Sequence, residues 1–517
     1  MKQTIKKLWI LIAMLWLSIS ASAYDFEVDG IAYNITSFSD LKCSVTSKET
    51  GYMGNITIPD IVSFNGKELS VTEIEDNAFQ NNIDLIAVCI PSSVKVIGMG
   101  AFKNCVNLEQ LTIQDGLCYI HSYSFGQCSK LKNVILPNTV KEIGNNCFED
   151  CNALSEIKFS DKLSELGAYA FTNCSSLNTI SLPNSLAVVK EHTFDGCTNL
   201  SEIQLGDELK EISDYAFSEC DFMSFTVPNS VTDIGKCILD NCKNLETFSI
   251  GTGLSVIYSN PISNCPNVKN FIILDGFSSL KFDFSNENYK EIRSFSYGGK
   301  YYYYNTRAGA FKDADFEYVY IGRPIYNPSE IFKWEQDYSG RDFKNWSYSY
   351  TLPPFYGNKN IKAIEFGKNA KAYSTEILCE GGESYVYGWL EECESLETIE
   401  GLDLKEIGIN FAKNATSLKN LEILSATSNI GDYAFWGCSS LDSIIIGPSV
   451  INIGKNAFTD CNALKSIFCK SAVPPTYSSE FSKEIYLNCD LYIPLGTETE
   501  YRNTSPWNNF WNMEESI

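Results

Sequence analysis

The residue types that most often carry out enzyme chemistry are unevenly represented in this chain. It contains only two histidines, His121 and His192, against 19 cysteines and 64 acidic side chains. Histidine is the commonest general base and a usual zinc ligand, so chemistry based on it would have to use one of these two residues. Both fit more simply as surface turn residues. A glycosidase needs only two carboxylates, but no acidic pair stands out from the many others.

Sequence motifs for common active sites and cofactors are also missing. We find no G-x-S-x-G, no H-E-x-x-H, and no glycine loop that would cradle a phosphate or a dinucleotide. We therefore expect no catalytic residue, no metal site and no cofactor, and predict that the chain is not an enzyme. A hydrolase with a carboxylate pair is kept as a distant alternative.

The cysteines mark a repeat. Eleven of them lie three residues after a large apolar position of the repeat. Seven phenylalanines occupy this apolar position in consecutive repeats at a spacing of 23 residues, and a cysteine follows each of them except the first. These phenylalanines are Phe79, Phe102, Phe125, Phe148, Phe171, Phe194 and Phe217. One column of stacked thiols follows from this spacing, and we expect buried free cysteines that fill space or satisfy backbone groups of the turns. The spacing does not fit paired zinc ligands.

Each repeat contains the elements of one solenoid turn. In the segment 177–182, Ile180 and Leu182 alternate with Thr179 and Ser181, which is the periodicity of a strand with one buried face. A second short apolar pair precedes a recurrent glycine, for which we expect a corner conformation. The A-F-x-x-C stretch predicts a short helical or 3₁₀ turn whose phenylalanine points inward. Because a unit of 23 residues cannot bury its own apolar face, the units must stack.

The motif I-G-x-x-A-F-x-x-C-x-x-L-x-x-I-x-I-P resembles the BspA-type, or Treponema pallidum-type, leucine-rich repeat, over about 70–275 and 396–470. The resemblance implies a leucine-rich repeat solenoid of about 23-residue repeats, each with short parallel β-strands and a short helical or 3₁₀ turn, closed by N- and C-terminal caps. It also implies a surface or secreted protein with an adhesive or protein-binding role.

The first 23 residues have the pattern of a secretory signal peptide. Lys2, Lys6 and Lys7 precede an apolar run over 8–17, and Ala21-Ser22-Ala23 fits a cleavage site. We therefore expect a secreted or cell-surface protein with no integral membrane segment after cleavage. The predicted organisation is a signal peptide over 1–23, an N-terminal β cap over 24–70, regular repeats over 71–275, aromatic-rich degenerate repeats over 276–395, regular repeats over 396–470 and a C-terminal cap over 471–517.

Two surfaces are candidate binding sites. Outward-facing strand residues form a flat polar face that suits an extended protein or glycan: Gln110, Thr112, Asn133, Glu156, Lys158, Thr179, Ser181, Glu202 and Gln204. The segment 276–356 holds 24 aromatic residues, so Tyr301, Tyr302, Trp334 and Trp346 form a candidate aromatic platform, with the alternative that these rings are core.

The net charge of −24 argues against a nucleic-acid ligand, because such binding depends on cations that displace phosphate counterions. The predicted function is an exported, non-enzymatic recognition protein, with adhesion to host or bacterial surface proteins as its role. The alternative is a glycan-binding accessory protein that uses the aromatic-rich segment.

Overall fold

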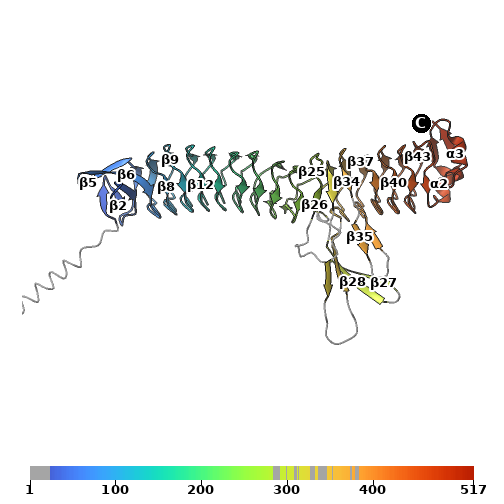
Figure 1. The fold of residues 1–517 in the computed structure, drawn as a ribbon, viewed down its shortest axis with the longest axis horizontal. Helices are drawn as coiled ribbons and strands as arrows, with labels where there is room; N and C mark the ends of the chain where they lie inside the picture. Colours follow the sequence, from blue (N-terminus) through green and yellow to red (C-terminus); the bar gives the residue numbers. More distant parts are fainter. Residues whose placement is uncertain are drawn as a thin grey trace, which may run out of the picture. The chain divides into compact units, whose positions relative to one another are not determined.

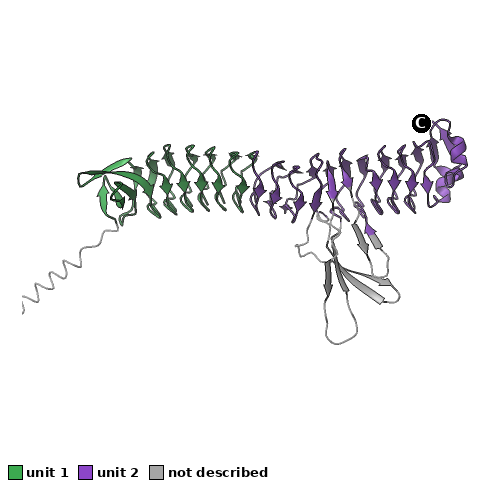
Figure 2. Cartoon of the chain, viewed as in Figure 1, with its two compact units in different colours: residues 1–206 green, residues 207–517 purple. Residues whose placement is uncertain are grey.

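The computed structural model divides into two compact units, residues 1–206 and 207–517 (Figure 2). The structure describes residues 24–282, 291–297, 300–307, 311, 314–326, 332–335, 346–351, 353–372, 375–378 and 384–516. The segment 1–23, for which we predict a signal peptide, lies outside these residues. The two units are considered separately below.

Unit 1 begins with a small group of strands that do not follow the repeat. Strand β1 (Phe26–Val28) pairs antiparallel with β2 (Ile31–Ser37), and β2 pairs antiparallel with β3 (Lys42–Val45). The β1–β2 turn contains Asp29 and Gly30, both with positive φ, as the Asp-Gly hairpin signal in the sequence predicts. Strand β6 (Lys67–Ile74) continues this sheet beside β3 in parallel, and β5 (Ile61–Phe64) pairs antiparallel with β6.

Every later turn of unit 1 contributes one strand to each of two parallel stacks. The register pairs residues 23 positions apart, for example Asn133 with Glu156 and Ile120 with Ile143, so the predicted repeat length is confirmed. The first stack contains β4 (Gly54–Thr57), β7 (Leu85–Ile90), β9 (Gln110–Ile113), β11 (Asn133–Ile135), β13 (Glu156–Lys158), β15 (Thr179–Ser181) and β17 (Glu202–Gln204). The second contains β8 (Val96–Ile97), β10 (Tyr119–Ile120), β12 (Glu142–Ile143), β14 (Glu165–Leu166) and β16 (Val188–Val189) (Figure 1).

A ladder of phenylalanine rings runs through the interior of unit 1. The rings of Phe125 and Phe148 lie 5.4 Å apart, and those of Phe148 and Phe171 lie 5.2 Å apart, in stacked geometry with interplanar angles of 6° and 7°. All three side chains are fully buried. The A-F-x-x-C stretch that holds each ring forms a tight turn closed by an i to i+3 hydrogen bond, as from Cys151 N to Phe148 O at 3.1 Å.

The cysteine column lies beside this ladder. Each thiol donates to the carbonyl oxygen of the phenylalanine one turn earlier, as from Cys128 to Phe102 at 3.2 Å and from Cys151 to Phe125 at 3.2 Å. Among the described residues no cysteine forms a disulfide. The column therefore satisfies turn carbonyls and fills core volume, which explains one thiol per turn.

The recurrent glycine has a different cause from the one the sequence indicates. At Gly144 an added Cβ would lie 2.4 Å from the backbone nitrogen of Ser122 in the preceding turn, and Gly144 does not have a positive φ. The expected corner conformation is therefore wrong here. Glycine is required because two turns approach too closely for a side chain.

Unit 2 is built around one large parallel sheet. Its strands, in spatial order, are β19 (Ser224–Val227), β22 (Thr247–Ile250), β25 (Asn270–Ile273), β29 (Tyr318–Ile321), β33 (Ala363–Phe366), β37 (Thr398–Leu402), β39 (Asn420–Ile423), β41 (Ser443–Ile446), β43 (Ser466–Cys469), β45 (Asp490–Ile493) and β46 (Asn512–Glu515).

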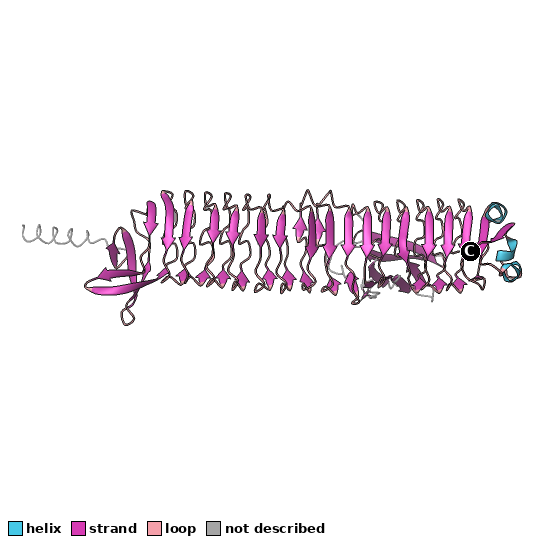
Figure 3. Cartoon of the chain, turned by 90° about the horizontal axis from the view of Figure 1, so that it is seen from above, coloured by secondary structure: helices cyan, strands magenta, loops and turns pink. Residues whose placement is uncertain are grey.

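The short strands of unit 2 form separate parallel groups (Figure 3). They are β18 (Glu211–Ile212) with β20 (Asp233–Ile234); β21 (Leu239–Asp240) with β24 (Ile262–Ser263); β23 (Val256–Ile257), β26 (Leu280–Phe282), β30 (Pro324–Tyr326) and β34 (Lys371–Ala372); and β38 (Glu406–Ile407), β40 (Asn429–Ile430), β42 (Asn452–Ile453) and β44 (Thr476–Tyr477).

The aromatic-rich middle segment combines repeat strands with long excursions. The sequence segments 316–322 and 361–367, which we expect to be strands, form β29 and β33 of the large sheet, so this prediction is confirmed. The excursions add strands that pair with one another outside that sheet. They are β27 (Glu291–Tyr297), β28 (Lys300–Arg307), β31 (Phe332–Glu335), β32 (Trp346–Thr351), β35 (Thr375–Leu378) and β36 (Ser384–Tyr387).

The C-terminal part of unit 2 contains α2 (Lys483–Asn488), α3 (Glu498–Arg502) and a 3₁₀ turn, η1 (Trp507–Asn509). Trp507 and Tyr501 are buried, and they donate to the backbone carbonyls of Pro475 at 2.7 Å and Ser471 at 2.6 Å. The sequence indicates a last strand near Leu491, but β46 follows it and is the last strand of the sheet.

Candidate functional site

The predicted polar face of unit 1 is present as one row of exposed side chains. Within β13, Glu156 and Lys158 are exposed while Ile157 between them is buried, and the neighbouring strands alternate in the same way. All nine predicted residues are exposed: Gln110 and Thr112 in β9, Asn133 in β11, Glu156 and Lys158 in β13, Thr179 and Ser181 in β15, and Glu202 and Gln204 in β17. We call this row the polar face.

The polar face is held in place by register and by a few lateral contacts. Asn133 pairs in register with Glu156, and Thr179 with Glu202. Ser181 Oγ donates to Gln204 Oε1 at 3.0 Å. Since these side chains are short or exposed and present both donors and acceptors, the face can form hydrogen bonds with an extended ligand but offers no aromatic anchor.

The large sheet of unit 2 has a different exposed face. In one lateral row the parallel register aligns Tyr320 with Glu365 and Glu365 with Glu400. A second set aligns Ile445 with Phe468 and Phe468 with Tyr492. This row lies outside the face that the sequence predicts, whose last residue is Gln204.

Two tyrosines of this face, both in β29, hydrogen-bond to acidic side chains. Tyr318 donates to Glu365 Oε2 at 2.6 Å, and Tyr320 donates to Asp275 Oδ1 at 2.9 Å. Partial burial, and then the hydrogen bond to the carboxylate, raises the pKa of both phenols, that of Tyr320 to about 12. Both hydroxyls are therefore protonated donors at neutral pH.

A row of paired charges lies at the start of the same strands. Glu317 contacts Lys269 at 3.2 Å and Lys362 at 2.7 Å, and the adjacent turns continue with the pairs Lys419–Glu397 at 2.5 Å and Lys465–Asp442 at 2.9 Å. Hydrogen bonds from the two lysines, Lys362 first, lower the pKa of Glu317. Exposed pairs of this kind contribute little stability individually, but they favour one register between turns.

The candidate aromatic platform lies mostly beyond what the structure describes. Tyr301 and Tyr302 fall in β28, Trp334 in β31 and Trp346 in β32, where the backbone pairings Trp334 with Ser347 and Glu335 with Trp346 are described. The side chains of these four aromatic residues lie outside the described residues. The platform therefore stays a prediction.

The two histidines lie outside the strands of unit 1. His121 is exposed, and His192 is half-buried, with its Nδ1 2.9 Å from Asp195 Oδ2 and its ring stacked on Tyr169 at 4.7 Å. Among the described residues, no group of three or more His, Cys, Asp or Glu side chains could hold a metal ion.

Three buried thiols of the column are poor nucleophiles for a physical reason. Burial raises the pKa of Cys151 to about 12, and it raises the pKa of Cys105 and Cys393 to about the same value. Because the thiolate is the reactive form, these residues are suited to packing and not to catalysis.

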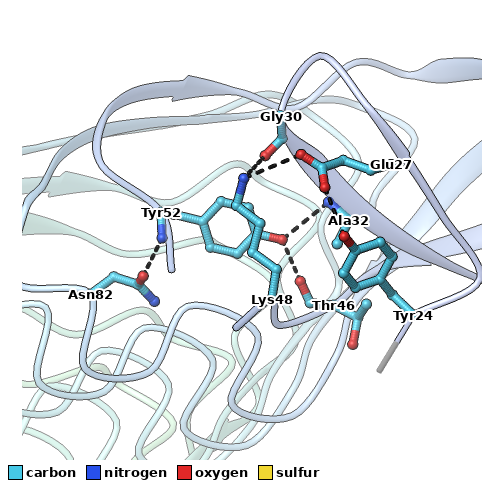
Figure 4. Close-up of polar contacts among 8 residues, drawn as sticks. All are labelled: Tyr24, Glu27, Gly30, Ala32, Thr46, Lys48, Tyr52 and Asn82. Atoms are coloured by element: carbon cyan, nitrogen blue, oxygen red, sulfur yellow. Dashed lines mark hydrogen bonds and ion pairs between the residues drawn. The ribbon is translucent and has the colours of Figure 1, made fainter. Parts of the chain in front are cut away.

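Another polar cluster lies among the first strands of unit 1 (Figure 4). Lys48 Nζ contacts Glu27 Oε1 at 3.4 Å and donates to the carbonyl of Gly30 at 2.5 Å, while Tyr24 donates to Glu27 Oε2 at 2.8 Å. The hydroxyl of buried Tyr52 accepts from Ala32 N at 3.2 Å and donates to a backbone carbonyl. These contacts join the loop 46–52 to the first two strands, so the cluster has a structural role.

Within the part of the chain that the structure describes, no helix is both long and apolar enough to cross a membrane.

Comparisons with known proteins identify the repeat. The family model described as "BspA type Leucine rich repeat region (6 copies)" matches residues 57–178, 164–290 and 387–497. No curated protein matches the chain.

Solved structures with a similar chain trace are leucine-rich repeat proteins. A leucine-rich repeat protein from Bacteroides ovatus is 20% identical with a TM-score of 0.40, covering 88% of this chain and 100% of that one. The T. pallidum leucine-rich repeat protein is 24% identical with a TM-score of 0.35, covering 43% of this chain and 90% of that one. A leucine-rich cell surface protein from Faecalibacterium prausnitzii is 19% identical with a TM-score of 0.33, and the match covers 96% of this chain and 100% of that one.

Proposed function

The chain belongs to the BspA-type leucine-rich repeat family, and from this premise we propose that it is an exported, non-enzymatic recognition protein. It binds proteins on a bacterial or host surface, and adhesion is its role. The observation that carries the proposal is the polar face of unit 1, a regular row of exposed donors and acceptors on a rigid stack of strands.

The physical design of the polar face supports recognition. In three of its strands the inward residue is buried, as Val134, Ile157 and Ile180 are. The row is therefore organised before a ligand arrives, and preorganisation lowers the entropic cost of binding. A row of adjacent short strands also offers many weak contacts to a long partner. An extended protein surface fits such a row better than a small molecule does, because small molecules bind in concave sites.

Export is the second part of the proposal. The basic start, apolar run and small residues of 1–23 support secretion to the cell surface or beyond. Cleavage after Ala23 would produce a mature chain that starts at Tyr24. N-terminal sequencing of the protein released by the producing cells tests this step, and an intact Met1 on the mature protein would contradict it.

A second candidate is glycan binding by the middle segment. Its 24 aromatic residues in 276–356 favour it, since rigid aromatic rings supply contact area for sugar rings as well as for proteins. Replacing Trp334 and Trp346 by alanine distinguishes the alternatives. A glycan platform loses sugar binding with the fold intact, whereas core rings lower the unfolding temperature.

The main experiment is binding of the purified chain to immobilised matrix proteins, bacterial surface proteins and glycans at low and high salt. The test variant Glu156→Lys/Glu202→Lys reverses two charges on the polar face. The control Glu165→Lys/Glu191→Lys makes the same charge change at exposed positions outside that face. We expect saturable binding to a protein that the test variant loses and the control keeps. Absence of any saturable protein binding, or equal loss in both variants, would contradict the proposal.

A further inference from the structure

The exposed face of the large sheet in unit 2 carries an acidic block beside an apolar block. Glu365, Glu400 and Glu422 project from β33, β37 and β39, and Ile445, Phe468 and Tyr492 follow on β41, β43 and β45. We call these six residues the acid–aromatic strip. The strands are consecutive neighbours in one parallel sheet, so the strip is continuous across it.

The acidic block is unfavourable for the isolated chain. Glu365 and Glu400 are paired directly in register on neighbouring strands, which lie about 4.8 Å apart, so two side chains of like charge project side by side. Like charges directly opposite each other destabilise a sheet. Glu422, in the next strand, contacts Lys470 at 3.4 Å. In the described part of the chain, neither Glu365 nor Glu400 forms an ion pair, and Glu365 has only the hydroxyl of Tyr318 as its hydrogen-bond donor.

The row of paired charges at the start of these strands differs from the acidic block. At the start of the same strands, lysine and acid alternate from turn to turn, as in Lys269, Glu317 and Lys362. The same sheet therefore pairs Glu317, Glu397 and Asp442 with lysines, whereas Glu365 and Glu400 have no ion pair among the described residues. Solubility alone does not explain the difference, since both rows are at the surface.

The apolar block supplies anchors that the polar face of unit 1 does not have. The rings of Phe468 and Tyr492 lie 4.6 Å apart and are stacked with an interplanar angle of 9°. Both rings, and Ile445 beside them, are only partly buried although they are on the outward side of the sheet. Rigid aromatic contact area of this kind is typical of binding hot spots.

We propose that the acid–aromatic strip binds an extended basic polypeptide segment, with its Lys or Arg side chains on Glu365 and Glu400 and its apolar side chains on Phe468 and Tyr492. This proposal rests on the protein-binding function above and names the chemical class of the partner. From β33 to β45 there are five strand steps, or about 24 Å, which about seven extended residues span. Charge complementarity favours a cationic peptide over a neutral sugar, because a sugar would leave the repulsion between the carboxylates in place.

The test measures fluorescence anisotropy of a labelled synthetic peptide in which an arginine-rich half precedes a tryptophan-rich half, with the full chain as receptor. The variant Glu365→Gln/Glu400→Gln removes the paired charges and keeps the shape of the side chains. Its matched control, Glu165→Gln/Glu191→Gln, makes the same change at exposed positions outside both the polar face and the acid–aromatic strip. A second variant, Phe468→Ser, tests the apolar block independently.

We expect the Glu365→Gln/Glu400→Gln variant to bind the peptide about threefold to tenfold more weakly, since each exposed ion pair contributes only modestly to the binding free energy. Its unfolding temperature should be unchanged or higher, because like-charge repulsion is relieved. The control should bind as the wild type does, and a peptide with glutamate in place of arginine should not bind.

Equal affinities for the wild type and the Glu365→Gln/Glu400→Gln variant would overturn the proposal. So would binding of a neutral oligosaccharide that Phe468→Ser abolishes and the glutamine variant leaves unchanged. A surface protein that binds the chain with no sensitivity to these variants would leave the proposed function intact and refute only this assignment of the partner.

Discussion

Replacing Phe148 by alanine tests the stacked ladder that holds the polar face in place. Its ring is fully buried and stacks on Phe125 at 5.4 Å and on Phe171 at 5.2 Å. Truncating a buried phenylalanine to alanine costs about 3–5 kcal/mol, since burial is lost and a cavity remains. Phe148→Leu keeps most of the apolar volume but loses both ring stacks, so we expect a cost of about 1–3 kcal/mol.

Hydrogen exchange measured turn by turn is the suitable assay, because repeat arrays need not unfold in two states. In a stack where each turn contacts its neighbours, the loss should be local. We expect faster exchange in the turns of Phe125, Phe148 and Phe171, with the C-terminal turns of unit 2 unchanged. The matched control is Phe38→Ala, the same change at a side chain that is 78% exposed, and it should have almost no effect. A cost below about 1 kcal/mol for Phe148→Ala, or uniform acceleration over both units, would refute the reasoning.

Three further predictions concern other parts of the framework. The thiol of Cys151 should not react with a thiol reagent in the native chain at pH 8 but should react after unfolding, since burial raises its pKa to about 12; rapid native labelling would contradict this. Buried Arg323 donates to the backbone carbonyls of Gly251, Thr252 and Leu254. Arg323→Met should therefore lower the free energy of unfolding in urea by about 3 kcal/mol or more. The control Lys371→Met, at an exposed position, should leave that free energy unchanged. The pKa of Glu317 is lowered in the folded chain, so its ionised form stabilises the fold. This contribution is present above the unfolded-state pKa of 4.5 and is lost as the pH falls through the folded-state pKa. Glu317→Gln should therefore flatten the dependence of the unfolding temperature on pH in acid, and an unchanged slope would contradict this.

The regular repeat could be predicted from sequence because its physical causes recur at one spacing. The ring of Phe148 stacks on the equivalent rings of the adjacent turns, and the thiol of Cys151 donates to the adjacent turn, so both residues must occupy the same place in every turn. The 23-residue period therefore fixes the register of Asn133 with Glu156. The outward positions of the polar face follow directly from that register. The resemblance to a known repeat family added the caps and the surface role as expectations.

The acid–aromatic strip could not be predicted in the same way, because excursions of unequal length interrupt the period. Tyr320 and Glu365 are neighbours in the sheet although 45 residues separate them in the chain. A register shift between β37 and β39 further displaces the acidic positions around Glu400. The role of Gly144 was also hidden, since close approach between turns depends on their packing and not on local backbone preference.

The most direct test of the account is carboxyl-group footprinting of the chain while it is bound to the protein recovered from the binding panel. The central claim is that recognition uses the exposed faces of the parallel strands. We therefore predict that binding protects Glu156 and Glu202 on the polar face, or Glu365 and Glu400 on the acid–aromatic strip, while Glu165 and Glu191 outside these faces stay reactive. Protection confined to Glu165 and Glu191, or no change at any sheet-face carboxylate on saturation, would contradict the account.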